Sequence, residues 1–110
     1  MDYGVVIGKL EEIIKIIREN PRKAFPLWVY ELDSCSRELA SYYSKLSKSM
    51  GYDGKLKVDI PELCHLKQAI RRISGLCALG GFSHSINIVY EIILTTIEDL
   101  RLQEKLDGGV

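Results

Sequence analysis

Four residues of the types that bind zinc lie in the second half of the chain: Cys64, His65, Cys77 and His84. Neighbouring residues on a helix point about 100° apart, so adjacent ligands there do not face the same ion. The chain has no C-x-x-C or H-x-x-x-H pair, the spacings that bring two ligands together. Glu62 and His65 form one Glu-x-x-His match to the di-metal bundles, but no glutamate stands on the other apolar stripes. The sequence therefore predicts no metal site.

The residues for nucleophilic catalysis are also poorly placed. Cys35 could act as a nucleophile only if folding brought His65 or His84 to it. It lies in the middle of an apolar helical pattern, where a free thiol behaves as a small hydrophobic side chain. Gly80-Gly81 follows a helical pattern and lacks the lysine and the preceding strand of a phosphate-binding loop. We therefore expect no catalytic residue, no cofactor and no enzymatic activity.

The strongest pattern in the chain runs over residues 25–50. Its apolar positions are four, three, four, three and four residues apart, which is the heptad spacing of a long helix packed on other helices. Pro26 suits the first turn of that helix, because the missing N–H has no helical partner there. The pattern predicts a central helix with the core positions Trp28, Leu32, Cys35, Leu39, Tyr42 and Leu46.

Three further segments carry apolar residues on one side of a helix. Asn20-Pro21 ends the first of them. Asp59 and Glu62 resemble an acidic capping box at the start of the next helix, and Gly75 inside it predicts close approach of another backbone. The last helix begins at Ser83 or Ser85. The predicted core positions are Tyr3, Val6, Leu10, Ile13, Ile14 and Ile17; Leu63, Leu66, Ala69, Ile70, Ile73, Leu76 and Cys77; and Ile86, Val89, Ile93, Ile97 and Leu100.

The order of these segments is two helices, a longer connection over residues 51–58, and two more helices. Short links between consecutive helices favour antiparallel neighbours. The sequence therefore predicts an all-α protein, an antiparallel four-helix bundle with long second and fourth helices. Its 110 residues are the size of one domain, so we assign residues 1–110 to a single domain.

Composition and length limit the environment of the protein. The formal net charge is zero, and no apolar run reaches the roughly 18 residues that a membrane span needs. The three cysteines are an odd number without the short spacings of a disulfide framework. We therefore expect a cytoplasmic protein without membrane contacts. Many Ile, Lys and Glu, with only two Asn and two Gln, give the chain a thermophile-like composition.

The charges are unevenly distributed along the chain. Residues 45–72 contain seven basic residues against three acids, whereas residues 83–110 contain five acids against two basic residues. A basic stretch of this kind can hold a phosphate backbone, or it can face an acidic surface of another protein. The basic residues are Lys45, Lys48, Lys55, Lys57, Lys67, Arg71 and Arg72.

Four apolar residues fall outside the predicted core stripes. Val5 and Ile16 lie away from the stripe of the first helix, and Ile88 and Ile92 project to a second side of the last helix. A helix that is apolar on two sides is central in a core or forms part of an interface. The sequence thus predicts a non-catalytic subunit of a larger assembly, whose partner is a second copy of itself or a dedicated protein.

In size and all-helical build, the chain resembles the small helical subunits of CRISPR effector complexes and the capsid subunits of filamentous archaeal viruses. That resemblance rests on architecture and implies an alternative function, in which the basic stretch over residues 45–72 binds a nucleic-acid backbone without reading its sequence. The partner would then include single-stranded nucleic acid.

Overall fold

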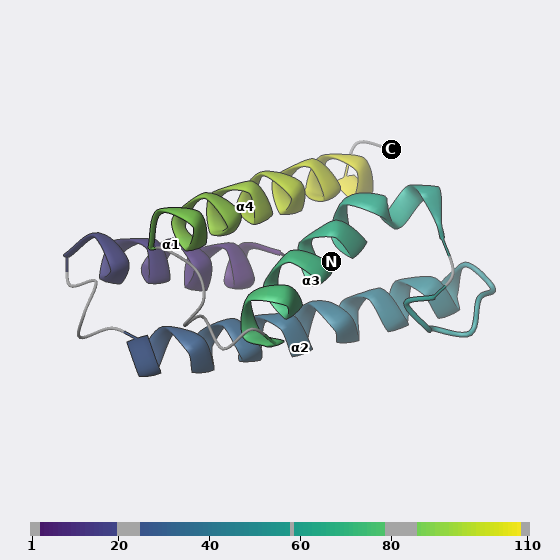
Figure 1. Ribbon diagram of the computed structural model, residues 1–110. Helices are drawn as coiled ribbons and strands as arrows, with labels where there is room; N and C mark the ends of the chain where they lie inside the picture. The colour runs from purple at the N-terminus through teal and green to yellow at the C-terminus, as the bar shows by residue number, and fades with distance from the viewer. Residues whose placement is uncertain (1–2, 20–24, 58, 79–85, 109–110) are drawn as a thin grey trace.

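The computed structural model describes residues 3–19, 25–57, 59–78 and 86–108, and these residues are helical apart from short connecting segments. Figure 1 shows the order of the elements. Helices α2 and α4 have 25 and 23 residues, against 16 in α1 and 15 in α3. The elements are α1 (Gly4–Glu19), α2 (Phe25–Ser49), the 3₁₀ turn η1 (Pro61–Leu63), α3 (Cys64–Ala78) and α4 (Ile86–Gly108).

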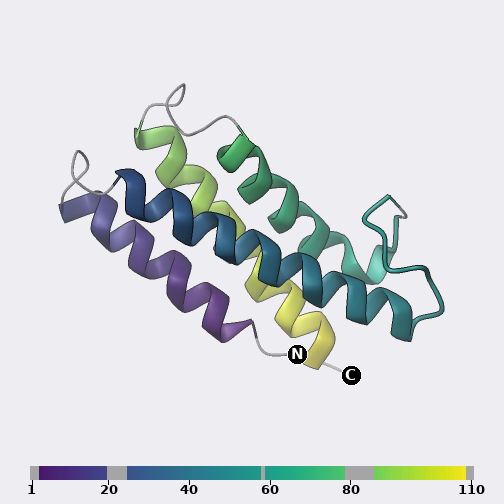
Figure 2. The same ribbon diagram turned by 90° about the horizontal axis from the view of Figure 1, so that it is seen from below.

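The helices pack in a ring in which each contacts the next, and α4 returns to contact α1. The most extensive packing joins α3 to α4 and α2 to α3. Figure 2 shows that the chain direction alternates from one helix to the next. Tyr3 is joined to the last turn of α4, because its hydroxyl donates a hydrogen bond of 2.8 Å to the Asp107 carboxylate. The ring places the core between the helices and leaves one side of each helix exposed.

Most of the predicted core positions are buried. All six stripe residues of α1 are buried, as are the predicted residues of η1 and α3 apart from the half-buried Cys77. Val89, Ile93, Ile97 and Leu100 of α4 are also buried. The side chain of Ile86 lies outside the described residues, as does that of Trp28. The patterns of α1, α3 and α4 are therefore confirmed for their described positions.

The heptad pattern of α2 is confirmed only in its first half. Leu32, Cys35 and Leu39 are buried, but the buried stripe then moves to Tyr43 and Ser47. An α-helix has 3.6 residues per turn, so a stripe that follows a strict 3.5-residue repeat drifts off the contact side unless the helices supercoil. The predicted positions Tyr42 and Leu46 are consequently half-buried at the edge of the core.

The expected capping box at the start of α3 is wrong. The cap position before Pro61 is Ile60, without a side-chain cap hydrogen bond. The Asp59 carboxylate instead accepts a hydrogen bond of 2.6 Å from the Lys67 ammonium group. The cap comes instead from Gln103 of α4. Its amide oxygen accepts the Leu66 N–H at 3.1 Å, and its amide nitrogen donates to the Glu62 carbonyl at 2.8 Å. A side chain from another helix thus satisfies backbone groups that helix ends leave unpaired.

Two glycine positions also show how the connection and α3 are built. Gly75 is exposed, and a Cβ there would meet no atom within 4 Å, so the predicted close backbone approach is wrong. In the α2–α3 connection, predicted as a loop, Gly54 has a φ of +85°. A Cβ at Gly54 would lie 2.8 Å from Ser44 and from Lys48, so this position requires glycine.

Candidate interaction surfaces

The three cysteines lie in different environments. Cys35 is buried in the core, where burial raises the pKa of its thiol to about 11. Such a thiol carries little thiolate at neutral pH and is a poor nucleophile. Cys64 is exposed on α3, and Cys77 is half-buried with its pKa raised mainly by burial. The environments of Cys35 and Cys77 suit structural thiols, whereas the Cys64 thiol is exposed.

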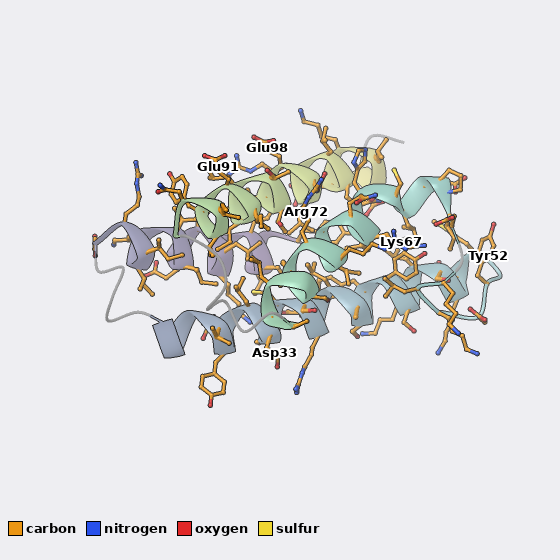
Figure 3. All side chains as sticks on the ribbon, in the orientation of Figure 1. Asp33, Tyr52, Lys67, Arg72, Glu91 and Glu98 are labelled. Carbon is orange, nitrogen blue, oxygen red and sulfur yellow. The ribbon has the colours of Figure 1, made fainter. Side chains whose placement is uncertain are left out.

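The one described histidine belongs to a group that joins α3 to α4. His65 Nδ1 lies 3.8 Å from Asp99 Oδ1, and the Arg72 guanidinium forms an ion pair with the same carboxylate. Figure 3 shows Arg72 reaching from α3 towards α4. Within the described parts of the chain, no three His, Cys, Asp or Glu residues are grouped so that they could hold a metal ion. His84 lies outside the described residues.

Two of the seven basic residues over residues 45–72 form ion pairs with acids of the same chain. Lys67 is only 5% exposed, and its ammonium group is bonded to Asp59. The hydrogen bond from Lys67, together with its charge, lowers the pKa of the Asp59 carboxyl. Arg72 is occupied by its ion pair with Asp99. Neither side chain is therefore part of the exposed basic surface.

The other five basic residues are exposed. Four come from the last turns of α2 and the connection, which lie together at one end of the molecule (Figure 1), and Arg71 comes from the middle of α3. Tyr52 is exposed beside them on the connection, as Figure 3 shows. We call this surface the basic end; it consists of Lys45, Lys48, Lys55, Lys57 and Arg71.

A second surface follows one side of α4, and we call it the outer strip. It carries apolar side chains that are largely exposed: Ile88 at 48%, Leu102 at 44% and Leu106 at 51%. Ile92 is half-buried between them and the core. Asp99 of the strip pairs with Arg72, so the strip runs along the edge of α4 next to α3. The Asp99 side chain is only 13% exposed, and Thr95 is half-buried. The six positions of the strip are Ile88, Ile92, Thr95, Asp99, Leu102 and Leu106.

The opposite edge of the outer strip is bordered by charged residues. Figure 3 shows Glu91 and Glu98 along the outer side of α4. These two glutamates are exposed, and so is Lys105, seven residues beyond Glu98. We call Glu91, Glu98 and Lys105 the charged row. The outer strip is therefore an apolar surface with a polar border, the composition found in many protein interfaces.

Val5 and Ile16 belong to a different surface from the outer strip. Val5 is exposed, and Ile16 is half-buried in a groove of about 400 Å³ between α1 and α2 that exposed Tyr30 also lines. Ile88 and Ile92 lie on α4 next to α3. The four apolar residues that the sequence singled out are thus divided between two surfaces, and the structure does not bring them together.

A groove between α1 and α4 was not anticipated from the sequence. It measures about 470 Å³. The Glu11 carboxylate accepts a hydrogen bond of 3.2 Å from Arg101 across it, and the Arg18 guanidinium lies 5.8 Å from the ring centre of Tyr90. Glu11 and Arg101 are ninety residues apart in the chain, so no local pattern could have revealed the groove.

Tyr3, Gln103 and Asp107 form a polar cluster that the sequence did not indicate. Tyr3 and Gln103 are fully buried, and both donate hydrogen bonds to the Asp107 carboxylate, at 2.8 and 3.0 Å. Burial, followed by the bond to Asp107, strongly raises the pKa of the Tyr3 hydroxyl. Because its buried groups are bonded to one another and to the start of α3, the cluster fixes how the chain ends pack.

No protein-family model, curated protein or solved structure matches this chain. Among the described helices, none is both long enough and apolar enough to cross a membrane. A functional interpretation therefore rests on the outer strip and the basic end.

Proposed function

We propose that this protein is a non-catalytic subunit of a larger assembly, folded as an antiparallel four-helix bundle and acting through contacts with another polypeptide. The observation that carries the proposal is the outer strip of α4, with Ile88, Leu102 and Leu106 each about half exposed. Apolar side-chain area that is removed from water on binding stabilises a complex by about 25 cal/mol per Å². Grouped apolar side chains with a polar border are typical of surfaces that bind another protein.

Capture of interacting polypeptides by a tagged copy tests this proposal. The tagged chain is expressed in the cells that encode it, together with an untagged copy of itself. Leu102→Glu/Leu106→Glu places two charges on the outer strip. The matched control, Ser34→Glu/Ser41→Glu, places two charges at exposed positions on one side of α2. Circular dichroism establishes that both variants fold.

We expect the wild type and the control to capture the same polypeptide, and the strip variant to lose it because a charge cannot be buried there without a partner. The captured polypeptide can be the untagged copy or another protein. Equal capture by all three proteins, or no capture by the wild type, would remove the basis of the proposal.

The basic end supports a second candidate function, sequence-independent binding of a nucleic-acid backbone. Five cationic side chains are exposed there, and the exposed ring of Tyr52 could stack on a base. Fluorescence anisotropy with labelled single-stranded RNA and DNA tests it. Binding through phosphate contacts weakens steeply as salt rises, and the slope gives the number of phosphates neutralised.

Charge reversal at the basic end provides the matched comparison. Lys55→Glu/Lys57→Glu/Arg71→Glu should weaken binding about tenfold or more. The control Lys15→Glu/Arg18→Glu/Arg37→Glu makes the same change of net charge at exposed positions on α1 and α2. An equal effect of both triple variants would show a general charge effect and exclude the basic end as the binding site.

A further inference from the structure

We propose that the polypeptide covering the outer strip is a second copy of this chain, whose α4 packs antiparallel to the first. This inference rests on the function proposed above and names the partner. The six positions of the strip are separated by four, three, four, three and four residues. That spacing keeps one line of side chains in contact with a second helix along its length, as in a two-stranded coiled coil.

The residue types of the outer strip are arranged symmetrically. In chain order the strip is apolar, apolar, polar, polar, apolar, apolar, and its midpoint is residue 97. An antiparallel copy turned about that midpoint places Ile88 opposite Leu106 and Ile92 opposite Leu102. At the midpoint Thr95 lies opposite Asp99, whose carboxylate keeps its ion pair with Arg72 of its own chain. A two-fold interface requires a surface that is complementary to itself. The order of residue types in the strip meets that requirement.

The charged row is compatible with the same arrangement. Antiparallel helices bring the row of one copy alongside the row of the other. Glu91 then lies next to Lys105 of the second copy, and the two-fold axis repeats that pair. Within one chain, these residues are fourteen positions apart, about 21 Å along the helix, so they cannot pair with each other. A second copy thus supplies an opposite charge to Glu91 and to Lys105.

A parallel arrangement fits the charges less well. Parallel helices bring the charged row of one copy towards the other edge of the strip on its partner. Val89, Thr96 and Gln103 lie along that edge, and all three are buried in the core of their own chain. Glu91 and Lys105 would then have no opposite charge to meet. The charges therefore favour the antiparallel pair.

The centre of the antiparallel pair contains one unfavourable contact. Glu98 lies near the midpoint of the strip, so the two-fold axis places it beside Glu98 of the second copy. Like charges at close range weaken an interface. Removing this charge should therefore tighten the dimer, whereas the loss of an exposed charge remote from the interface would leave association almost unchanged.

Reversal of the paired charges is the first test, measured by sedimentation equilibrium of the purified full chain. Lys105→Glu should weaken dimerisation about tenfold, because both inter-chain pairs become repulsive. Glu91→Lys/Lys105→Glu should restore it to near the wild-type value. Glu98→Gln should strengthen it a few-fold. Failure of the double variant to restore association would overturn the antiparallel register.

Disulfide trapping is the second test, in a Cys64→Ser background that removes the exposed native thiol. Oxidation of the variant carrying both Ile88→Cys and Leu106→Cys should give a covalent dimer. Ile88→Cys alone and Leu106→Cys alone should not, because each new thiol then faces an aliphatic side chain. Efficient trapping by either single variant would show a parallel or different pairing and overturn the proposal.

The outcome also separates this inference from the function on which it rests. One outcome is that the purified chain is monomeric up to about 0.1 mM, while Leu102→Glu/Leu106→Glu still loses a captured protein other than the chain itself. The second copy would then be excluded as partner, but the assembly function would stand. If neither dimer nor captured protein depends on the outer strip, both proposals fail.

Discussion

Helix α4 carries two lines of residues that have the same spacing, are displaced by one position and differ in exposure. The inner line is buried and consists of Val89, Ile93, Thr96, Leu100 and Gln103. The outer strip is exposed at Ile88, Leu102 and Leu106 and half-buried at the three positions between them. Spacing alone therefore does not determine which line of a two-sided helix faces the core.

The polar members of the two lines show what distinguishes them. Thr96 donates a hydrogen bond of 2.7 Å to the Ile92 carbonyl, and the Gln103 amide is bonded to the start of α3 and to Asp107. The inner line can be buried because its polar groups have partners. The outer strip is bordered by Glu91 and Glu98, whose charges would lose their hydration if that side turned inwards. The cost of burying charge thus sets the orientation of α4.

The largest expected difference between the two lines is in the free energy of unfolding. Ile93→Ala removes a fully buried side chain and should cost about 2–5 kcal/mol, through lost burial and the cavity left behind. Leu102→Ala on the outer strip should change the unfolding free energy of the monomer by less than about 0.5 kcal/mol. Urea denaturation at low protein concentration measures both. Similar losses for the two variants would contradict the orientation of α4.

The next prediction concerns the pH dependence of stability that the buried thiol of Cys35 produces. Burial raises the pKa of Cys35 from 9.0 to about 11. The neutral thiol therefore stabilises the folded state below about pH 9, and that contribution is lost as pH rises from 9 to 11. One pKa unit corresponds to about 1.4 kcal/mol, so the loss should approach about 2–3 kcal/mol. The raised pKa values of Tyr3 and Tyr43 act in the same direction at higher pH.

The contribution of Cys35 is measured by urea unfolding of the wild type and Cys35→Ala at several pH values. The variant should be less stable at pH 7, because a buried side chain is shortened. Its stability should nevertheless fall less steeply between pH 9 and 11. Parallel pH profiles for the two proteins would show that the Cys35 thiol has no part in the alkaline loss.

The sequence was sufficient to predict elements whose apolar residues lie on one side. The α1 stripe from Tyr3 to Ile17 is buried as expected, because only one orientation of that helix removes its apolar area from water. In α2 the expected heptad fails after Leu39, since the geometry of the neighbouring helices decides whether a stripe follows 3.5 or 3.6 residues per turn. That geometry is a property of the packed molecule.

The candidate surfaces could be predicted only in part, because folding brings charged side chains next to ion-pair partners from other elements. Lys67 was grouped with the basic residues by its position, yet it is buried against Asp59 from the connection. Arg72 is occupied by Asp99 of another helix. In contrast, Ile88 and Ile92 could be assigned to a second side of α4 from spacing, while Leu102 and Leu106 extend that side beyond the predicted pair.

The two glutamines of the chain provide a smaller contrast between inner and outer positions. Gln103→Leu leaves the Leu66 N–H and the Glu62 carbonyl without the partner that they have now. An unsatisfied buried group costs about 1–3 kcal/mol, so stability should fall by that amount. Gln68→Leu changes an exposed residue of α3 and should have an effect within about 0.5 kcal/mol. Equal thermal unfolding midpoints for the two variants would exclude the cap from α4.

The smallest expected effect is a gain in stability on the outer side of α3. Gly75 is exposed inside the helix, with open space where a Cβ would stand. Gly75→Ala should raise the free energy of unfolding by about 0.5–1 kcal/mol, because alanine loses less backbone freedom on folding. Gly54→Ala is the matched control and should destabilise the protein, since the same added methyl group meets Ser44 and a positive φ. If Gly75→Ala were also destabilising, another backbone or a partner would have to cover this side of α3.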